Sequence, residues 1–366
     1  MTTRRVLYSV ATVLLVSVAV FSNTGGGSWT TTPVAKATST IAPPALLTSG
    51  SIRPEGFLAQ RVRSPQVNPP IFVGSWQDTD LSTSVRLYSA RTGRVVKQLA
   101  TFGEFFTNNG LALSPDGGSV FVTLIGKSSL YIERISTSTR RRGFVAFGAQ
   151  PAISPDGRYL AYGTGGHYQE LAVRQLSSGK TTTFDLRSLI GNRANLLAGQ
   201  IAWLGDGSQI ALIPQFDLTP VGASASHPQV TKSASCSQTR SDQTCLIVVD
   251  LRSSKSPARM LLLSEPSPGI DQMSTCLSQP DAVALVMSLG DHSFVEKVTI
   301  SSTGVHAVTL ADLSPDLVMA MNPLADGVLY LVGHTAPALW VAELSGGRLV
   351  NAHLLIRNSM LAPIAW

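Results

Sequence analysis

The chain has 366 residues, of which 44% are hydrophobic and 14% are charged, and its formal net charge is +6. Long disorder needs low hydrophobicity with high net charge, so the composition excludes it for most of the chain. A polytopic membrane protein is also excluded, because only the N-terminus has a long uncharged apolar run. The first 50 residues hold three bases and no acid; 28 bases less these three leave 25 against 22 acids. This weak excess does not favour nucleic acid as a partner.

Residues 1–24 have the pattern of an export signal. Met1–Arg5 carries two positive charges, and Val6–Phe21 is a run of sixteen residues without a charge. As a helix this run spans about 24 Å, against about 30 Å for a bilayer core. A cleaved signal peptide and an uncleaved membrane anchor are therefore both open. In either case we expect an extracytoplasmic protein, secreted or anchored to the membrane by residues 6–21.

Residues 25–69 are rich in Gly, Ser, Thr, Pro and Ala and have no sustained hydrophobic period. This composition is typical of a flexible linker. The aromatic and branched residues that could build a core become frequent only after it. The sequence therefore predicts one folded domain over residues 70–366.

A repeated segment that ends in Asp or Asp-Gly organises this domain. Its aspartates are 40, 50, 75 and 45 residues apart, and each copy precedes a run of β-branched and aliphatic residues. Periods near 40–50 residues with about four short strands each are typical of propeller blades. The copies are Leu111–Gly117, Ala152–Gly157, Ile201–Gly207, Met321–Gly327 and the degenerate Thr275–Asp281.

The Ser-Pro-Asp-Gly sequence in the first two copies has the chemistry of a turn between two strands. Proline fixes φ at the first turn position, aspartate can accept hydrogen bonds from the nearby backbone, and glycine adopts the left-handed conformation that closes the turn. We therefore interpret Asp116 and Asp156 as structural residues rather than catalytic ones.

The two ends of the domain complete the blade count. Leu361–Trp366 has the pattern of an innermost strand without a partner, whereas Ile71–Trp76, Val85–Ala90 and Val95–Ala100 are three strands without an innermost one. Their pairing would close the array and remove its open edges. The sequence thus predicts an all-β fold, a six-bladed β-propeller closed by pairing of the C-terminal strand with the first blade. Residues 214–244 are predicted as an inserted loop.

The Ser-Pro-Asp-Gly repeats over about residues 70–366 resemble those of the TolB-like β-propeller family, a relative of the WD-repeat propellers. The resemblance implies a six-bladed extracytoplasmic propeller, often a protein-interaction scaffold and sometimes the substrate-gating domain of a peptidase. The third copy departs from the family pattern with Leu-Gly-Asp-Gly, and the fifth has Gln-Pro-Asp without the glycine.

In an up-and-down propeller, the turns between the first and second strands of each blade lie on one face, here called the turn face. The loops between the second and third strands lie on the other, here called the loop face, with the connections between blades. Converging histidines there could bind a metal or exchange protons, but polar residues are the usual content of loops. We therefore assign no catalytic or metal residue. The binding-face candidates are Trp76, Asp78, Asp80, His167, Tyr168, Asp291, His292 and His334.

Three cysteines and one basic run complete the set of singled-out residues. Cys236 and Cys245 bracket a polar segment in the inserted loop, and we predict a disulfide between them in an oxidising compartment. Such a bridge stabilises by about 2–3 kcal/mol. Cys276 is predicted to be a buried apolar residue, and Arg140–Arg142 a solvated turn between strands.

The sequence contains no G-x-S-x-G nucleophile motif and no H-E-x-x-H zinc motif. We therefore expect a non-enzymatic scaffold without a cofactor, a monomer that binds a protein or cell-envelope partner and meets the membrane only through its N-terminal segment. One alternative is an extracytoplasmic propeller enzyme (a lactonase, lyase or hydrolase). Another is a sensor of small ligands or glycans that uses the central funnel, with Trp76, Tyr168 and Trp340 as stacking surfaces.

Overall fold

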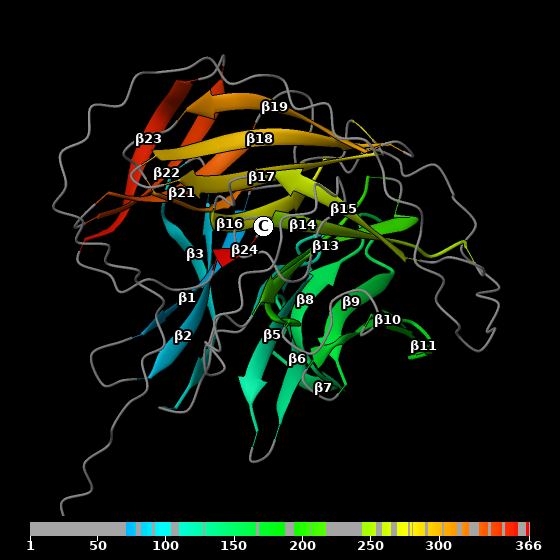
Figure 1. The fold of residues 1–366 in the computed structure, drawn as a ribbon. Helices are drawn as coiled ribbons and strands as arrows, with labels where there is room; N and C mark the ends of the chain where they lie inside the picture. The colour runs from blue at the N-terminus through cyan, green and yellow to red at the C-terminus, as the bar shows by residue number, and fades with distance from the viewer. Residues whose placement is uncertain are drawn as a thin grey trace, which may run out of the picture. The chain divides into compact units, whose positions relative to one another are not determined.

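The computed structural model describes the chain between residues 71 and 365 (Figure 1). The gaps in this description are 78–81, 90–91, 104–109, 127–128, 166–167, 187–193, 206, 217–243, 254–257, 265–268, 277–278, 280, 290–291, 302–303, 313–316, 322–328, 336–337, 346–347 and 358–363. The predicted export signal and the predicted linker lie outside the described residues, as do Asp78, Asp80, His167, Asp291 and Cys236. The described part holds no helix with the length and apolarity that a bilayer crossing needs.

Five sheets are each built from four strands that are consecutive in the chain, and each is a propeller blade. The first consists of β4 (Leu111–Leu113), β5 (Ser119–Ile125), β6 (Leu130–Ser136) and β7 (Arg142–Phe147). The second consists of β8 (Ala149–Ile153), β9 (Tyr159–Thr164), β10 (Glu170–Gln175) and β11 (Thr181–Asp185). The third consists of β12 (Ala194–Trp203), β13 (Gln209–Phe216), β14 (Thr244–Asp250) and β15 (Ala258–Ser264).

The other two consecutive sheets come from the C-terminal part of the chain. One consists of β16 (Gly269–Thr275), β17 (Ala282–Leu289), β18 (His292–Ile300) and β19 (Val305–Asp312). The other consists of β20 (Leu317–Met321), β21 (Leu329–Thr335), β22 (Ala338–Ser345) and β23 (Arg348–Arg357). All neighbouring strands within these sheets are antiparallel, which the short connections between most of them favour.

A composite sheet joins the two ends of the described chain. Its strands are β24 (Ile364–Ala365), β1 (Ile71–Gln77), β2 (Thr83–Ser89) and β3 (Val95–Phe102), in that order. Strand β24 pairs antiparallel with β1, with Ala365 opposite Val73 and Ile364 opposite Gly74. The first strand of each sheet also contacts the first strand of the next: β4 meets β8, β8 meets β12, β12 meets β16, β16 meets β20, and β24 meets both β20 and β4.

The two Ser-Pro-Asp-Gly segments occupy the positions that the sequence indicates. Leu111–Leu113 and Ala149–Ile153 are first strands, and the Ser-Pro-Asp-Gly residues connect each of them to the second strand of its sheet. The boundaries of the inserted loop were wrong, because β13 continues to Phe216 and β14 begins at Thr244. Residues 214–216 and 244 therefore belong to strands. The basic run was also placed wrongly in part, since Arg142 is the first residue of β7.

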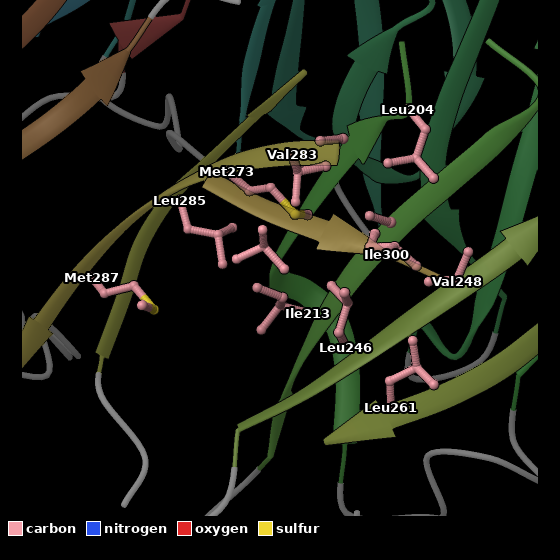
Figure 2. Close-up of a cluster of buried hydrophobic side chains, with 13 residues drawn as sticks. Leu204, Ile213, Leu246, Val248, Leu261, Met273, Val283, Leu285, Met287 and Ile300 are labelled. Carbon is pink, nitrogen blue, oxygen red and sulfur yellow. The ribbon is translucent and has the colours of Figure 1, made fainter. Parts of the chain in front are cut away.

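Most of the apolar core lies between neighbouring sheets. In β13, Ile210 and Leu212 pack on the β8–β11 sheet, whereas Ala211 and Ile213 pack on the β16–β19 sheet. Side chains on a strand point alternately to opposite faces, and here both faces are covered, so four consecutive residues, 210–213, are apolar. Figure 2 shows the second of these layers, where Ile213, Leu246 and Val248 meet Met273, Val283 and Leu285.

Trp203 ties two neighbouring sheets together. Its side chain is fully buried at the end of β12, and its indole Nε1 donates a hydrogen bond of 2.9 Å to the carbonyl oxygen of Ala152 in β8. The ring lies in one cluster with Ala161 and Leu171 of the preceding sheet. It therefore contributes both apolar packing and a satisfied polar group to the contact between the two sheets.

We expect Trp203→Ala to lower the free energy of unfolding by about 3–5 kcal/mol, because it leaves a large cavity between two sheets. Trp203→Phe should lower the free energy of unfolding by less, because phenylalanine keeps most of the ring volume. The main loss is then the unpaired carbonyl of Ala152, which accounts for about 1–3 kcal/mol. Urea unfolding followed by tryptophan fluorescence and circular dichroism measures both. Val308→Ala, at an exposed position, is the control, and equal stability of Trp203→Ala and wild type would contradict this role.

Candidate binding face

The turn face is built from hydrogen-bonded turns whose side chains are used locally. Asp116 Oδ1 accepts a hydrogen bond of 2.6 Å from the Ser114 hydroxyl and one of 2.9 Å from the Gly118 backbone N–H. Gly117 closes the turn at φ 67°, a conformation that favours glycine. The turn after β8 repeats this arrangement, with Asp156 accepting from Ser154 at 2.6 Å and from the Arg158 N–H at 3.0 Å.

Each of these turns is also bonded to the turn between the third and fourth strands of its own sheet. Four sheets share the contact, in which the backbone N–H at the end of the third strand donates to the carbonyl oxygen just before the second strand. The pairs are Thr137 to Gly118 (3.0 Å), Leu176 to Arg158 (2.9 Å), Leu251 to Ser208 (3.0 Å) and Ile300 to Asp281 (2.7 Å). In these four sheets, one backbone bond therefore joins the two turns of this face.

The two turn aspartates are held in their charged form. The hydroxyl of Ser114 and the Gly118 N–H lower the pKa of Asp116 below its ordinary 3.8. For Asp156, burial acts to raise the pKa, but hydrogen bonds from Ser154 and Arg158 outweigh it and the pKa is lowered. Arg158 adds an ion pair of 2.6 Å between its Nε and Asp156 Oδ2. These contacts account for both carboxylates as turn-stabilising groups.

The structure describes few of the binding residues that the sequence predicts for the loop face. Trp76 lies in β1 opposite Ser84, and its side chain is outside the description. His292 is the first residue of β18, opposite Leu289, and His334 lies in β21 between Leu317 and Leu339. The two histidines were expected in equivalent loops and are instead strand residues. The described backbone places them in different sheets, and their side chains lie outside the description.

Tyr168 is the candidate whose side chain is described. Its hydroxyl lies 3.4 Å from the backbone nitrogen of Leu130, which donates to it from the neighbouring sheet. Its backbone has φ 53°, and its N–H donates to the Gly165 carbonyl at 3.2 Å. Beside it, the Thr164 hydroxyl donates to the Phe147 carbonyl at 3.2 Å. Tyr168 thus joins two sheets on this face, a structural use that the sequence prediction of a stacking surface did not include.

Side chains of the types that bind metals do not form a cluster in the described residues. No group of three or more histidine, cysteine, aspartate or glutamate side chains could hold a metal ion within the described ranges. Glu296 is half-buried in β18; burial raises its pKa, and a hydrogen bond of 3.2 Å from the Thr309 hydroxyl acts in the opposite direction.

Cys245 is disulfide-bonded, and Cys276 is a free, buried thiol. The burial of Cys276 is as predicted, whereas the pairing of Cys245 with Cys236 stays a prediction.

No family model matches the sequence, and no curated protein sequence matches it. Solved structures do match. TolB from Acinetobacter baumannii has a TM-score of 0.56 at 13% identity; the match covers 81% of this chain and 66% of that one, so this chain spans slightly less than two thirds of TolB.

Two further matches cover the other chain almost completely. A chain of the Nidogen/Laminin complex gives a TM-score of 0.53 at 11% identity, over 81% of this chain and 98% of that one. A structure from Agrobacterium tumefaciens that is assigned as TolB gives a TM-score of 0.50 at 13% identity, and the match covers 77% of this chain and 97% of that one. At such identities the likeness concerns the fold. The chain is an all-β propeller of the kind found in TolB.

We expect Asp156→Asn to lower the melting temperature relative to the wild type at pH 7. This difference should disappear at acidic pH. The folded-state pKa of Asp156 is below 3.8, so the carboxylate stabilises the fold above that pH, and its contribution disappears as the pH falls through the folded-state pKa. Hydrogen bonds to a charged group contribute about 1.5–3 kcal/mol each, which is the upper limit for the loss of stability per bond at pH 7. Melting curves from pH 7 to pH 2.5 measure the difference.

Asp281→Asn is the control for this experiment, because Asp281 is exposed and takes the place of Arg158 in its own turn, not that of Asp156. Because the side chain is exposed, the melting temperature of this variant at pH 7 should equal that of the wild type. A constant difference between Asp156→Asn and wild type across the whole pH range would show that the charge of Asp156 does not stabilise the turn.

Proposed function

We propose that this protein is an extracytoplasmic propeller that serves as a non-enzymatic interaction scaffold and presents its loop face to a protein or cell-envelope partner. The observation that carries the proposal is the difference between the two faces. On the turn face, four sheets share the same internal backbone bond. On the loop face, the connection between β13 and β14 spans residues 217–243, far more than any connection between second and third strands in the other sheets.

The scaffold is closed, in this proposal, into a ring of six blades. Five blades are the consecutive sheets, and the composite sheet of β24 with β1–β3 is the sixth. The pairing of Val73 with Ala365 and of Gly74 with Ile364 supports this count, as do the contacts of β24 with the first strands on either side, β20 and β4. A closed ring leaves no open innermost edge and holds the loops on a fixed frame.

The fold likeness supports a role in binding. One of the similar chains comes from a Nidogen/Laminin complex, so a propeller of this kind is known in a complex with another protein. Export is supported by the charged Met1–Arg5 segment with the apolar Val6–Phe21 run, and by the disulfide at Cys245, since such bonds persist in oxidising compartments.

The loop face can be tested by removing the long connection. Replacing residues 217–243 by a short Gly-Ser turn should weaken capture of the partner at least tenfold, about 1.4 kcal/mol, and leave the melting temperature nearly unchanged. The partner is identified by cross-linking on intact cells, and its affinity for the purified chain is then measured. Trp76→Ala and His334→Ala should weaken capture in the same direction.

Arg252→Ala is the control on the turn face, because Arg252 is exposed and pairs locally with Asp250. It should bind the partner as the wild type does. Equal binding by the loop-replaced chain and the wild type would overturn the proposal, as would equal losses for Arg252→Ala. A stoichiometric metal found by elemental analysis would instead favour the enzyme alternative.

The second test concerns the predicted Cys236–Cys245 bridge. Peptide mapping without reduction should yield one cross-linked peptide with both residues, and Cys236→Ser should make Cys245 react with an alkylating agent. The variant should lose about 2–3 kcal/mol or less, because the bridge mainly restrains the loop before β14. Cys276→Ser should leave the bridge intact. A cross-linked peptide that joins two chains, or free Cys236 in the native protein, would contradict the assignment.

A further inference from the structure

An exposed aromatic pair lies on the outer strand of the β4–β7 sheet. Phe144 and Phe147 of β7 are 60% and 63% exposed, the highest values among the large apolar side chains in the described residues. Their rings meet edge to face with centroids 5.1 Å apart, and Phe144 also stacks on Tyr131 of β6 at 6.4 Å. Large apolar groups gathered on a surface are typical of binding sites. We call these three residues the aromatic edge.

A β-bulge brings the two phenylalanines to the same side. Residues three apart on a regular strand point to opposite faces. In β7, Ala146 lies opposite Ile132 and Phe144 opposite Glu133, so Val145 is an extra residue without a partner. As a result Val145 and Ala146 both turn inward, while Phe144 and Phe147 both turn outward.

The turn that leads into β7 adds positive charge at a strained position. Three turns between third and fourth strands have the same pair of backbone bonds, and their left-handed residue is Gly93, Arg140 or Gly179. An arginine at φ 60° is strained where glycine is not. Arg140 and its neighbour Arg141 are exposed and form no ion pair with a described residue. Arg142, in contrast, is held by Glu133 at 2.7 Å and by the ring of Phe102 at 4.3 Å.

The backbone of β7 is open on its outer side, because β7 is the last strand of its sheet. Apart from the Phe147 carbonyl, which accepts from the Thr164 hydroxyl, its outer N–H and C=O groups can pair with one more extended strand. This open backbone disfavours insertion into lipid, where unpaired backbone groups are costly. The arginines complement an acidic ligand, and the first 70 residues of the chain do not qualify, since their single acid is Glu55 against six bases.

We propose that β7 is a docking site for an extended acidic peptide segment of another protein. The segment adds as a fifth strand to the β4–β7 sheet, places apolar side chains on the aromatic edge, and sets carboxylates against Arg140 and Arg141. This surface follows the outer edge of the sheet and reaches the loop face only at Phe147, so the proposal does not rest on the one made for that face.

The test uses the full chain and a fluorescent synthetic peptide with alternating valine and threonine and with glutamates at both ends, so that either strand direction brings a carboxylate to Arg140. Fluorescence anisotropy should show saturable binding, and hydrogen exchange should slow in residues 142–147. A peptide with lysines in place of the glutamates, and an N-methylated peptide that cannot pair through its backbone, should each bind at least tenfold more weakly.

The variants separate binding from stability. Phe144→Ser with Phe147→Ser should reduce binding at least tenfold, and Arg140→Glu with Arg141→Glu should shift the preference to the lysine peptide. Arg140→Gly should weaken binding while the melting temperature stays equal or rises, because it removes the strained residue. Controls are Val96→Ser, an exposed apolar residue on β3, and Lys180→Glu, which matches Arg141 in the next sheet but has no aromatic edge beside it.

Four results would overturn the proposal. These are equal binding of the acidic and lysine peptides, unchanged binding by the Phe144 and Phe147 double variant, loss of binding in the two controls, and absence of saturable binding to the wild type. Two further measurements identify other occupants. Binding to vesicles with anionic lipid but not to the peptide would make the edge a membrane contact, and a dimer in sedimentation velocity that the double phenylalanine variant abolishes would make it a self-contact.

Discussion

The backbone bond between the two turns at one end of each sheet is the interaction on which the asymmetry of this protein depends. It joins Thr137 to Gly118, and it recurs in three further sheets at Leu176, Leu251 and Ile300. A bond that needs no side chain can be repeated while the sequence changes, which explains how the degenerate fifth copy keeps it at Asp281. Because this end of the sheets is fixed by its own backbone, length variation falls on the opposite end, where residues 217–243 are accommodated.

Packing between sheets imposes the second constraint. Alternate residues of β13 and β14 serve two different apolar layers, so each strand is buried on both faces. A polar insertion within such a strand would place unpaired groups between two sheets. The insertion therefore begins only after Phe216 and ends before Thr244, outside both strands. Cys245, the second residue of β14, is buried and disulfide-bonded, so a covalent bond restrains the start of this strand.

Local chemistry made much of the fold predictable. Ser-Pro-Asp-Gly defines its turn through proline and glycine conformations and through aspartate hydrogen bonds, all of which depend on neighbours in the sequence, and Gly117 and Gly157 adopt the expected left-handed conformation. The pairing of the C-terminal residues with β1 followed from counting strands. Features set by distant partners were not predictable. The bulge at Val145 depends on how β7 aligns with β6, and the same applies to the exposure of Phe144 and Phe147.

The candidate binding residues show the same limit. The sequence analysis placed His292 and His334 in loops because they follow runs of β-branched and aliphatic residues, but both belong to strands, where they pair with Leu289 and Leu339. Tyr168 was chosen for its ring, whereas its hydroxyl position depends on Leu130, which is 38 residues away in the sequence. A side chain that joins two sheets cannot be distinguished from a free binding residue before the neighbouring sheet is in place.

The outer strands show how the sheets protect their open outer edges, and why β7 stands out. Five of the six outer strands contain a register shift against the third strand, a device that twists an edge away from regular pairing. The sixth, β11, is regular, and its exposed positions are Thr181, Thr183 and Asp185. In β7 the shift instead turns two phenylalanines outward beside a strained arginine. Local sequence and fold disagree at the strained arginine and the exposed rings, and such conflicts are most common where a protein binds something.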